Sequence, residues 1–95
     1  MAAYLIAEIE VHNPELFEEY RKLVPATIAK HGGKYLVRGG TVDPIEGGWK
    51  PARVVVLEFP TMAQASRWYR SLDYAPALAI RLKASTGKAI LVEGV

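Results

Sequence analysis

The sequence predicts an α+β fold of ferredoxin-like topology, with the element order βαββαβ. Four short segments carry alternating or β-branched apolar residues, and the segments between them repeat their apolar residues at helical spacing. Because crossovers between strands are right-handed, this order places the helices on one face of a four-stranded sheet. At 95 residues the chain has the length of a single domain, spanning 1–95.

The first half of the chain predicts a strand, a helix and a second strand. Apolar residues alternate from Tyr4 to Val11. Asn13 is a typical N-cap, and Pro14 is favoured at the first helical position. The helix carries a stripe at i, i+4, i+7 spacing, which comprises Phe17, Tyr20, Leu23, Val24 and Ile28. His31 and two glycines end it, and the second strand runs from Lys34 to Gly39.

The second half predicts a long loop, a strand, two helical segments and a last strand. The loop from Gly40 to Lys50 is longer than most hairpins need, which makes it a functional candidate. Arg53 to Phe59 is the most β-branched segment, and Thr61 caps the helix after it. We expect a short helix over Ala77 to Ala84 and a fourth strand over Lys88 to Glu93.

Period-two alternation divides the strands between a helix-covered face and an open face. Glu58 is unfavourable beneath a helix, so its neighbours Leu57 and Phe59 point inward. The same alternation puts Tyr35 and Val37 inward. The residues predicted on the open face are Tyr4, Ile6, Glu8, Glu10, Leu36, Arg38, Val54, Val56 and Glu58. An apolar patch of this kind usually marks an interface, so we expect a homodimer that packs sheet on sheet.

Composition argues against several classes of partner. Twelve Lys and Arg against ten Asp and Glu are scattered along the chain, which does not suit a nucleic-acid or membrane-surface binder. The segment RVVVLEF has valines where RNA-recognition motifs of this topology carry stacking aromatic rings. No apolar run approaches the roughly 20 residues of a membrane helix. The start of the chain does not resemble a signal peptide and cysteine is absent, so we expect a cytoplasmic protein.

The sequence also lacks the motifs of metal and cofactor sites. His12 and His31 each flank a helix end, and neither belongs to an HxxxH or HExxH pattern. The stretch GGTVDPIEGG lacks the lysine-serine ending of a phosphate-binding loop and does not open a helix. We therefore expect no protein-bound metal and no cofactor.

Several spaced segments carry a family resemblance that covers almost the whole chain. These are GGKYLVRGG, EGGWKPARVVVLEFPTMAQA, WYRSLDY and ILVEG. Together they resemble the DUF1330 family of small proteins with a dimeric α+β barrel fold. The resemblance implies that fold and a dimer, but no established reaction. Members of the wider superfamily include cofactor-independent monooxygenases, small isomerases and dehydratases, and haem-degrading enzymes, with ligands held between sheet and helices.

Arg38 is the first candidate for a binding residue. An arginine just before two glycines can bind a carboxylate or enolate bidentately, because Gly39 and Gly40 let a ligand approach the backbone closely. The alternative is an ion pair with Glu8 or Glu58, within the chain or across an interface. The position of Arg38 in the family pattern keeps both interpretations open.

The long loop supplies three further candidates. Glu46, Trp49 and Arg53 lie on it or beside it. Trp49 either walls a pocket or anchors the loop by burying its ring against the second helix or a partner subunit. Glu46 would suit a general base if buried, although loop carboxylates are more often solvated.

The segment after the third strand adds aromatic candidates. Trp68 fits a helical core stripe better than a pocket wall. Tyr74, in the break between the helices, has a freer hydroxyl and is the better candidate for orienting a ligand. Arg81 belongs to the family pattern, but an ion pair with Glu15 or Glu19, or a contact with the last strand, is the simpler interpretation.

These residues predict a protein that binds a small, anionic or aromatic molecule in a pocket between sheet and helices. The residues that we expect in the pocket are Arg38, Trp49, Arg53 and Tyr74. Catalysis of an oxygenase, isomerase or dehydratase type stays open. The alternative function is a non-catalytic dimeric protein with a structural or interaction role.

Overall fold

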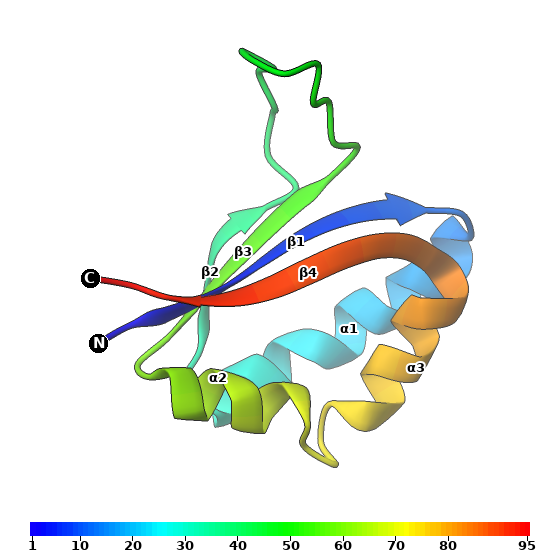
Figure 1. Cartoon of the computed structure of the whole chain (residues 1–95). Helices are drawn as coiled ribbons and strands as arrows, with labels where there is room; N and C mark the ends of the chain where they lie inside the picture. Colours follow the sequence, from blue (N-terminus) through cyan, green and yellow to red (C-terminus); the bar gives the residue numbers. More distant parts are fainter.

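The computed structural model describes residues 1–95 and has the predicted α+β architecture. The strands form one antiparallel sheet in the order β2-β3-β1-β4. The sheet and the three helices form two layers (Figure 1). The elements in chain order are β1 (Ala3–Val11), α1 (Pro14–Lys30), β2 (Lys34–Arg38), β3 (Val54–Phe59), α2 (Met62–Tyr69), α3 (Ala75–Ala84) and β4 (Ser85–Glu93).

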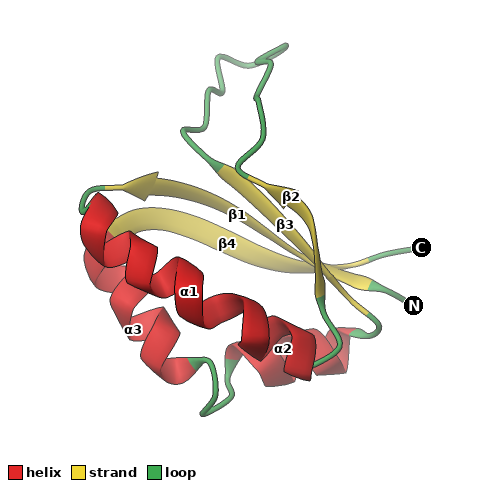
Figure 2. Ribbon diagram, turned by 180° about the vertical axis from the view of Figure 1, so that it is seen from behind, coloured by secondary structure: helices red, strands yellow, loops and turns green.

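All three helices cover the same face of the sheet, and the other face carries no helix (Figure 2). Their N-termini include the caps predicted from sequence. The side chain of Asn13 accepts a hydrogen bond from the backbone N–H of Leu16 at 3.1 Å, and Thr61 accepts one from Gln64 at 3.1 Å. After α1, Gly32 takes a positive φ of 80°, as expected for a left-handed cap.

The core lies between the helices and the sheet. Alternate residues of β1 point into it, and their neighbours point to the open face. Trp68 and Phe59 are fully buried, with ring centroids 5.4 Å apart. The inward residues of β1 are Ala3, Leu5, Ala7 and Ile9. Strand β1 therefore has the faces that alternation predicts.

A β-bulge in β2 changes which side chains face the helices. Tyr35 pairs with Leu57, but Val37 pairs with Val56 and Arg38 pairs with Val55, so the register shifts by one residue. The prediction that Arg38 points to the open face and Val37 inward was therefore wrong. The prediction assumed that side chains alternate strictly between the two faces. The extra residue of the bulge interrupts this alternation and moves Arg38 to the helix-covered face.

The boundaries of β4 and α3 differ most from the prediction, and those of β1, β2 and β3 differ by one residue each. β4 begins at Ser85 rather than Lys88, because Ser85, Thr86 and Gly87 pair with the end of β1. Most of this added stretch is exposed and polar, so it carries no apolar alternation to mark it. α3 begins at Ala75 rather than Ala77.

The long loop between β2 and β3 projects beyond the end of the sheet (Figures 1 and 2). The two chain termini lie side by side at the opposite end, where Gly94 donates a backbone hydrogen bond to Ala2 at 2.7 Å. No helix is both long enough and apolar enough to cross a membrane.

Candidate functional site

A cavity of about 40 Å³ lies between the sheet and the helices. Its walls combine aliphatic side chains with four tyrosines and four arginines, and they contain no carboxylate, histidine or lysine. The arginines are Arg21, Arg38, Arg53 and Arg81, and the tyrosines are Tyr20, Tyr35, Tyr69 and Tyr74. A largely apolar cavity with an excess of cationic groups is suited to an organic anion.

Arg38 reaches the cavity because of the bulge in β2. Its guanidinium carbon lies 4.4 Å from the ring centroid of Tyr35, a cation–π contact, while the residue as a whole remains exposed. Arg38 forms no ion pair within the chain. Both acids considered as partners are engaged elsewhere, because Glu8 lies 3.7 Å from Lys88 and Glu58 lies 3.2 Å from Lys34.

Arg53 enters the same cavity from the other end of the long loop. Its guanidinium carbon lies 5.7 Å from the ring centroid of Phe17. Its Nε is buried and has no hydrogen-bond partner. Burial lowers the pKa of Arg53, and the neighbouring charges of Arg21 and Arg38 lower it further. The charge of Glu18 acts in the opposite direction, but no carboxylate forms an ion pair with Arg53.

Gly39 makes room for this arginine. Its φ is +70°, and a Cβ at this position would lie 2.5 Å from Nη1 of Arg53. A side chain here would be strained by the backbone conformation and would also collide with the guanidinium. The two ends of the long loop therefore meet at the cavity, where Gly39 admits Arg53 beside Arg38.

The inner part of the cavity is polar and almost closed to solvent. The hydroxyl groups of Tyr20 and Tyr74 are 3.0 Å apart, and Arg81 is only 9% exposed. The Nε of Arg81 has no hydrogen-bond partner. Burial raises the pKa of Tyr20, and so does the proximity of Tyr74. Burial acts to lower the pKa of Arg81, but Tyr74 and Tyr20 outweigh it and the pKa is raised.

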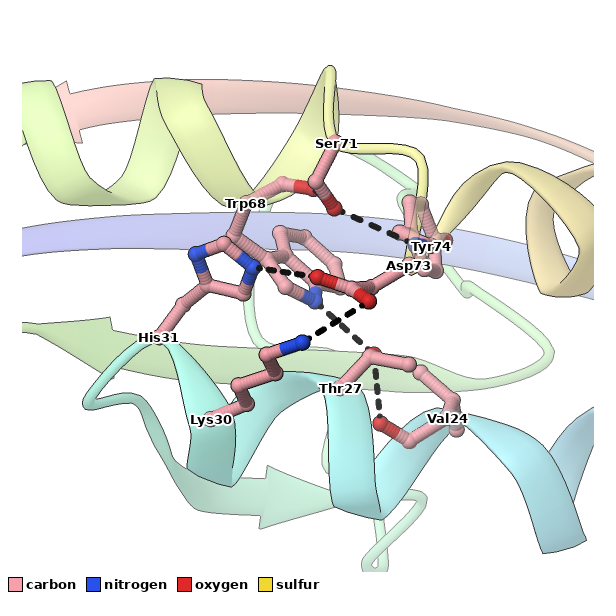
Figure 3. Close-up of polar contacts among 8 residues, drawn as sticks. All are labelled: Val24, Thr27, Lys30, His31, Trp68, Ser71, Asp73 and Tyr74. Atoms are coloured by element: carbon pink, nitrogen blue, oxygen red, sulfur yellow. Dashed lines mark hydrogen bonds and ion pairs between the residues drawn. The ribbon is translucent and has the colours of Figure 1, made fainter.

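Tyr74 is held in place by the core and by the turn between α2 and α3. Its ring stacks on Trp68 with centroids 4.2 Å apart, and its backbone N–H donates to Ser71 Oγ at 3.1 Å. Trp68 in turn donates from Nε1 to Thr27 Oγ1 at 3.0 Å (Figure 3). In the same turn, the carboxylate of Asp73 forms hydrogen bonds with Lys30 and His31 at the end of α1, which the dashed lines in Figure 3 mark.

The structure separates the residues that the sequence grouped into one pocket. Arg38, Arg53 and Tyr74 line the cavity. Trp68 is part of the core behind Tyr74, as the helical spacing favoured. Glu46 is exposed on the long loop and does not line the cavity.

Trp49 lies on the open face of the sheet. Its Nε1 donates to Glu8 Oε1 at 3.3 Å, and the residue remains 60% exposed. It borders a shallow hollow of about 200 Å³ whose apolar walls include Ile6, Val54 and Ile90. The loop thus places Trp49 against the face where we expect a partner subunit.

Sequence reasoning missed several residues of the cavity. Tyr20 belongs to the apolar stripe of α1, which its spacing identifies as core without showing that its hydroxyl meets Tyr74. Arg81 was expected to pair with Glu15 or Glu19 or to contact the last strand. It forms no ion pair, its carbonyl accepts a hydrogen bond from Ser85 at the start of β4, and its side chain lines the cavity. The one available signal was its position in the family pattern.

The family model of a domain of unknown function, DUF1330, matches residues 2–95. Among curated proteins, no sequence matches the chain. The fold is shared with solved structures at low sequence identity. RPA0582, a protein of unknown function from Rhodopseudomonas palustris, is 17% identical with a TM-score of 0.76, over 99% of this chain and 82% of its own.

Two further structures with this fold are described as oxygenases. SnoaB, a cofactor-independent oxygenase from Streptomyces nogalater, is 15% identical with a TM-score of 0.67, over 99% of this chain and 93% of its own. An antibiotic biosynthesis monooxygenase is 15% identical with a TM-score of 0.55, over 100% of this chain and 99% of its own. At these identities the similarity establishes the fold alone.

Proposed function

We propose that this chain, which belongs to the DUF1330 family, binds a small organic anion with an apolar or aromatic body in the cavity between its sheet and its helices. The observation that carries this proposal is the set of three arginines, Arg38, Arg53 and Arg81, that line one cavity without an acidic partner. Of the three, Arg81 is buried and Arg53 is half-buried. Burying a charge without a counter-ion is costly, so a bound anion would offset part of this cost.

A carboxylate is the anion that suits the outer part of the cavity. Arg38 is exposed and Arg53 is half-buried, so these two guanidinium groups lie where the cavity meets solvent. Guanidinium groups bind carboxylates through paired, charge-assisted hydrogen bonds. The aromatic rings of Tyr35 and Phe17 beneath them would hold the apolar body of the ligand.

Any reaction in this cavity would depend on stabilising negative charge. The arginines favour an enolate or phenolate over its protonated form, which is the electrostatic contribution expected for cofactor-independent oxygen chemistry or isomerisation. No carboxylate or histidine lines the cavity to act as a base. The fold neighbours described as oxygenases support this class of reaction.

The binding proposal is tested by calorimetric titration with 3-nitrobenzoate, an aromatic carboxylate. Arg38→Ala and Arg53→Ala should each weaken binding by about tenfold or more, because each removes a charge-assisted contact worth about 1.5–3 kcal/mol. Arg67→Ala is the matched control, since Arg67 is an exposed arginine on α2 that does not line the cavity. Equal loss in all three variants, or no binding by the unmodified protein, would contradict the proposal.

A second copy of the chain is the partner that we propose for the open face. Exposed apolar residues gather there from all parts of the sheet: Ile6, Leu36, Val37, Ile90 and Val92. Two of the acids among them are paired within the chain, Glu8 with Lys88 and Glu58 with Lys34, while Glu10 at the end of the face forms no ion pair. An apolar patch can pack against the same patch of a second copy, as a twofold interface requires.

This face also favours the alternative function, a non-catalytic interaction protein. In that case the long loop and Trp49 would serve the interface, and the arginine-lined cavity would have no ligand. The 3-nitrobenzoate titration separates the two functions, because a dimer that binds no anion supports only the second.

A further inference from the structure

We propose that the inner end of the cavity is an oxyanion subsite made by Tyr20, Tyr74 and Arg81. The ligand is then a carboxylic acid that also carries a phenolic or enolic hydroxyl, bound as its oxyanion. This inference rests on the proposed function and specifies its substrate class: the outer arginines hold the carboxylate, and the inner group holds the second oxygen.

The hydrogen-bond inventory of the inner group leaves donors for a ligand. The hydroxyls of Tyr20 and Tyr74 are 3.0 Å apart, and this contact uses only one of their two protons. The other proton has no acceptor among the hydrogen bonds of the protein. Arg81, which is 9% exposed, adds a buried Nε–H that also has no acceptor. An oxygen atom of a bound ligand would supply the acceptor that these donors do not have within the protein.

The charges around the inner group determine the form in which that oxygen binds. The titratable groups that line the cavity are arginines and tyrosines only, contributed by α1, β2, α2 and α3, by Arg53 just before β3 and by Tyr74 just before α3. Burial and the neighbouring hydroxyl raise the pKa of Tyr20, so this side chain stays a neutral donor and does not neutralise Arg81. A bound phenol or enol would therefore ionise more readily than in water.

The lining and the volume of the cavity indicate the chemical character and the size of the apolar part of the ligand. Between the outer arginines and the inner group the walls are aliphatic and aromatic, which suits a flat apolar body. The enclosed volume of about 40 Å³ holds roughly three water molecules at about 10–15 Å³ each. A ring-sized ligand therefore requires the exposed side chains of Arg21 and Arg38 to move outward, with its carboxylate at the mouth between Arg38 and Arg53.

The test compares 4-hydroxy-3-nitrobenzoate with 3-nitrobenzoate, which lacks only the hydroxyl. The nitrophenolate absorbs visible light, so its ionisation is followed directly during titration with protein. We expect the hydroxy acid to bind at least tenfold more tightly. We also expect the midpoint of its phenol titration to fall by about one pH unit in the complex, which corresponds to the same factor.

Two conservative variants locate the effect. Tyr20→Phe and Tyr74→Phe keep the rings that pack in the core and remove one hydroxyl each. Each should lower the affinity for the hydroxy acid by about tenfold and leave 3-nitrobenzoate binding within twofold. Arg81→Gln should abolish the shift of the phenol titration. If Arg81→Gln fails to fold, as circular dichroism would reveal, the two tyrosine variants still decide the question.

The outcomes separate this inference from the function on which it rests. Equal binding of the two acids, with an unshifted phenol titration, would overturn the oxyanion subsite and leave the proposed anion binding intact. Binding of neither acid would overturn both. Tyrosine variants that weaken both acids equally would assign the hydroxyl pair to the stability of the cavity and would contradict the subsite.

Discussion

At the scale of single residues, the cavity depends on a glycine as much as on its arginines. Arg53 occupies the space in which a side chain at position 39 would lie, and Gly39 also has a positive φ. The chain contains two matched comparisons on the same loop. Gly47 has a φ of +74° with no atom nearby, and Gly40 has neither the positive φ nor a close neighbour.

We predict that Gly39→Ala lowers the free energy of unfolding by about 1–2 kcal/mol, the usual cost of a non-glycine residue in this backbone region. It should also weaken 3-nitrobenzoate binding, because the new methyl group displaces the Arg53 guanidinium. Gly47→Ala should cost stability without affecting binding, and Gly40→Ala should change neither. Urea unfolding and calorimetric titration measure the two effects. Unchanged binding by Gly39→Ala would show that Arg53 does not need this space.

The sequence identified some residues of the site and not others, for a physical reason. Arg38 stood out because it precedes two glycines, Arg53 because it lies beside the long loop, and Tyr74 because it lies at a break between helices. Tyr20 and Arg81 look ordinary on their helices. Their significance comes from the 3.0 Å contact between the hydroxyls and from a guanidinium without a partner, which are tertiary facts.

At the scale of elements, the β-bulge in β2 has the largest effect on the site. The order of strands and helices, their caps and the faces of β1 all follow from periodicity and local chemistry, and the structure agrees with them. A single extra residue between Tyr35 and Val37 reverses the faces of the last two residues of the strand. Alternation therefore predicted the strand correctly and the direction of Arg38 incorrectly.

The turn between α2 and α3 is joined to the end of α1 by contacts of Asp73 whose contribution to stability depends on pH. Hydrogen bonds from Lys30 and His31 lower the pKa of the Asp73 carboxyl below its ordinary value of 3.8. A group whose pKa is depressed by folding stabilises the protein above its unfolded pKa, and this stabilisation is lost as the pH falls through the folded pKa. The carboxylate should therefore contribute at neutral pH and lose its contribution below pH 3.8.

We predict that Asp73→Asn lowers the thermal midpoint at pH 7, because the neutral amide no longer forms an ion pair with Lys30. The difference from the unmodified protein should shrink as the pH falls below 3.8 and the native carboxyl is protonated. Asp43→Asn is the control, since Asp43 lies on the long loop and forms no ion pair. Thermal melts across this pH range measure the effect. A difference that is constant with pH would assign Asp73 a role other than its charge.

At the scale of the whole molecule, the chain exposes more surface than a compact monomer of its mass. Its accessible area is 6101 Å², whereas about 5,400 Å² is typical for 10.5 kDa. Part of the excess is the projecting loop, and part is the open face of the sheet, where Ile90 is 60% and Leu36 49% exposed. Burying apolar surface of this kind against a partner lowers the free energy and so favours association.

The proposed homodimer gives the last prediction. Ile90 pairs with Ile6 in the sheet and lies on the open face beside the hollow bordered by Trp49. In a sheet-on-sheet dimer, Ile90→Glu would bury two unpaired carboxylates, one from each subunit, and should weaken association by at least tenfold. Leu72→Glu is the matched control, because Leu72 is 92% exposed on the turn after α2, away from the sheet.

Sedimentation equilibrium at micromolar concentration measures both variants against the unmodified protein. We expect a dimer for the unmodified chain and for Leu72→Glu, and a monomer or a mixture for Ile90→Glu. A stable unmodified monomer would rule out the dimer, and a dimer that persists in Ile90→Glu would show that the interface lies on another face.

Titration of the Ile90→Glu variant with the anion separates ligand binding from dimer formation. Because the cavity lies wholly between the sheet and helices of one chain, a folded monomer should still bind 3-nitrobenzoate.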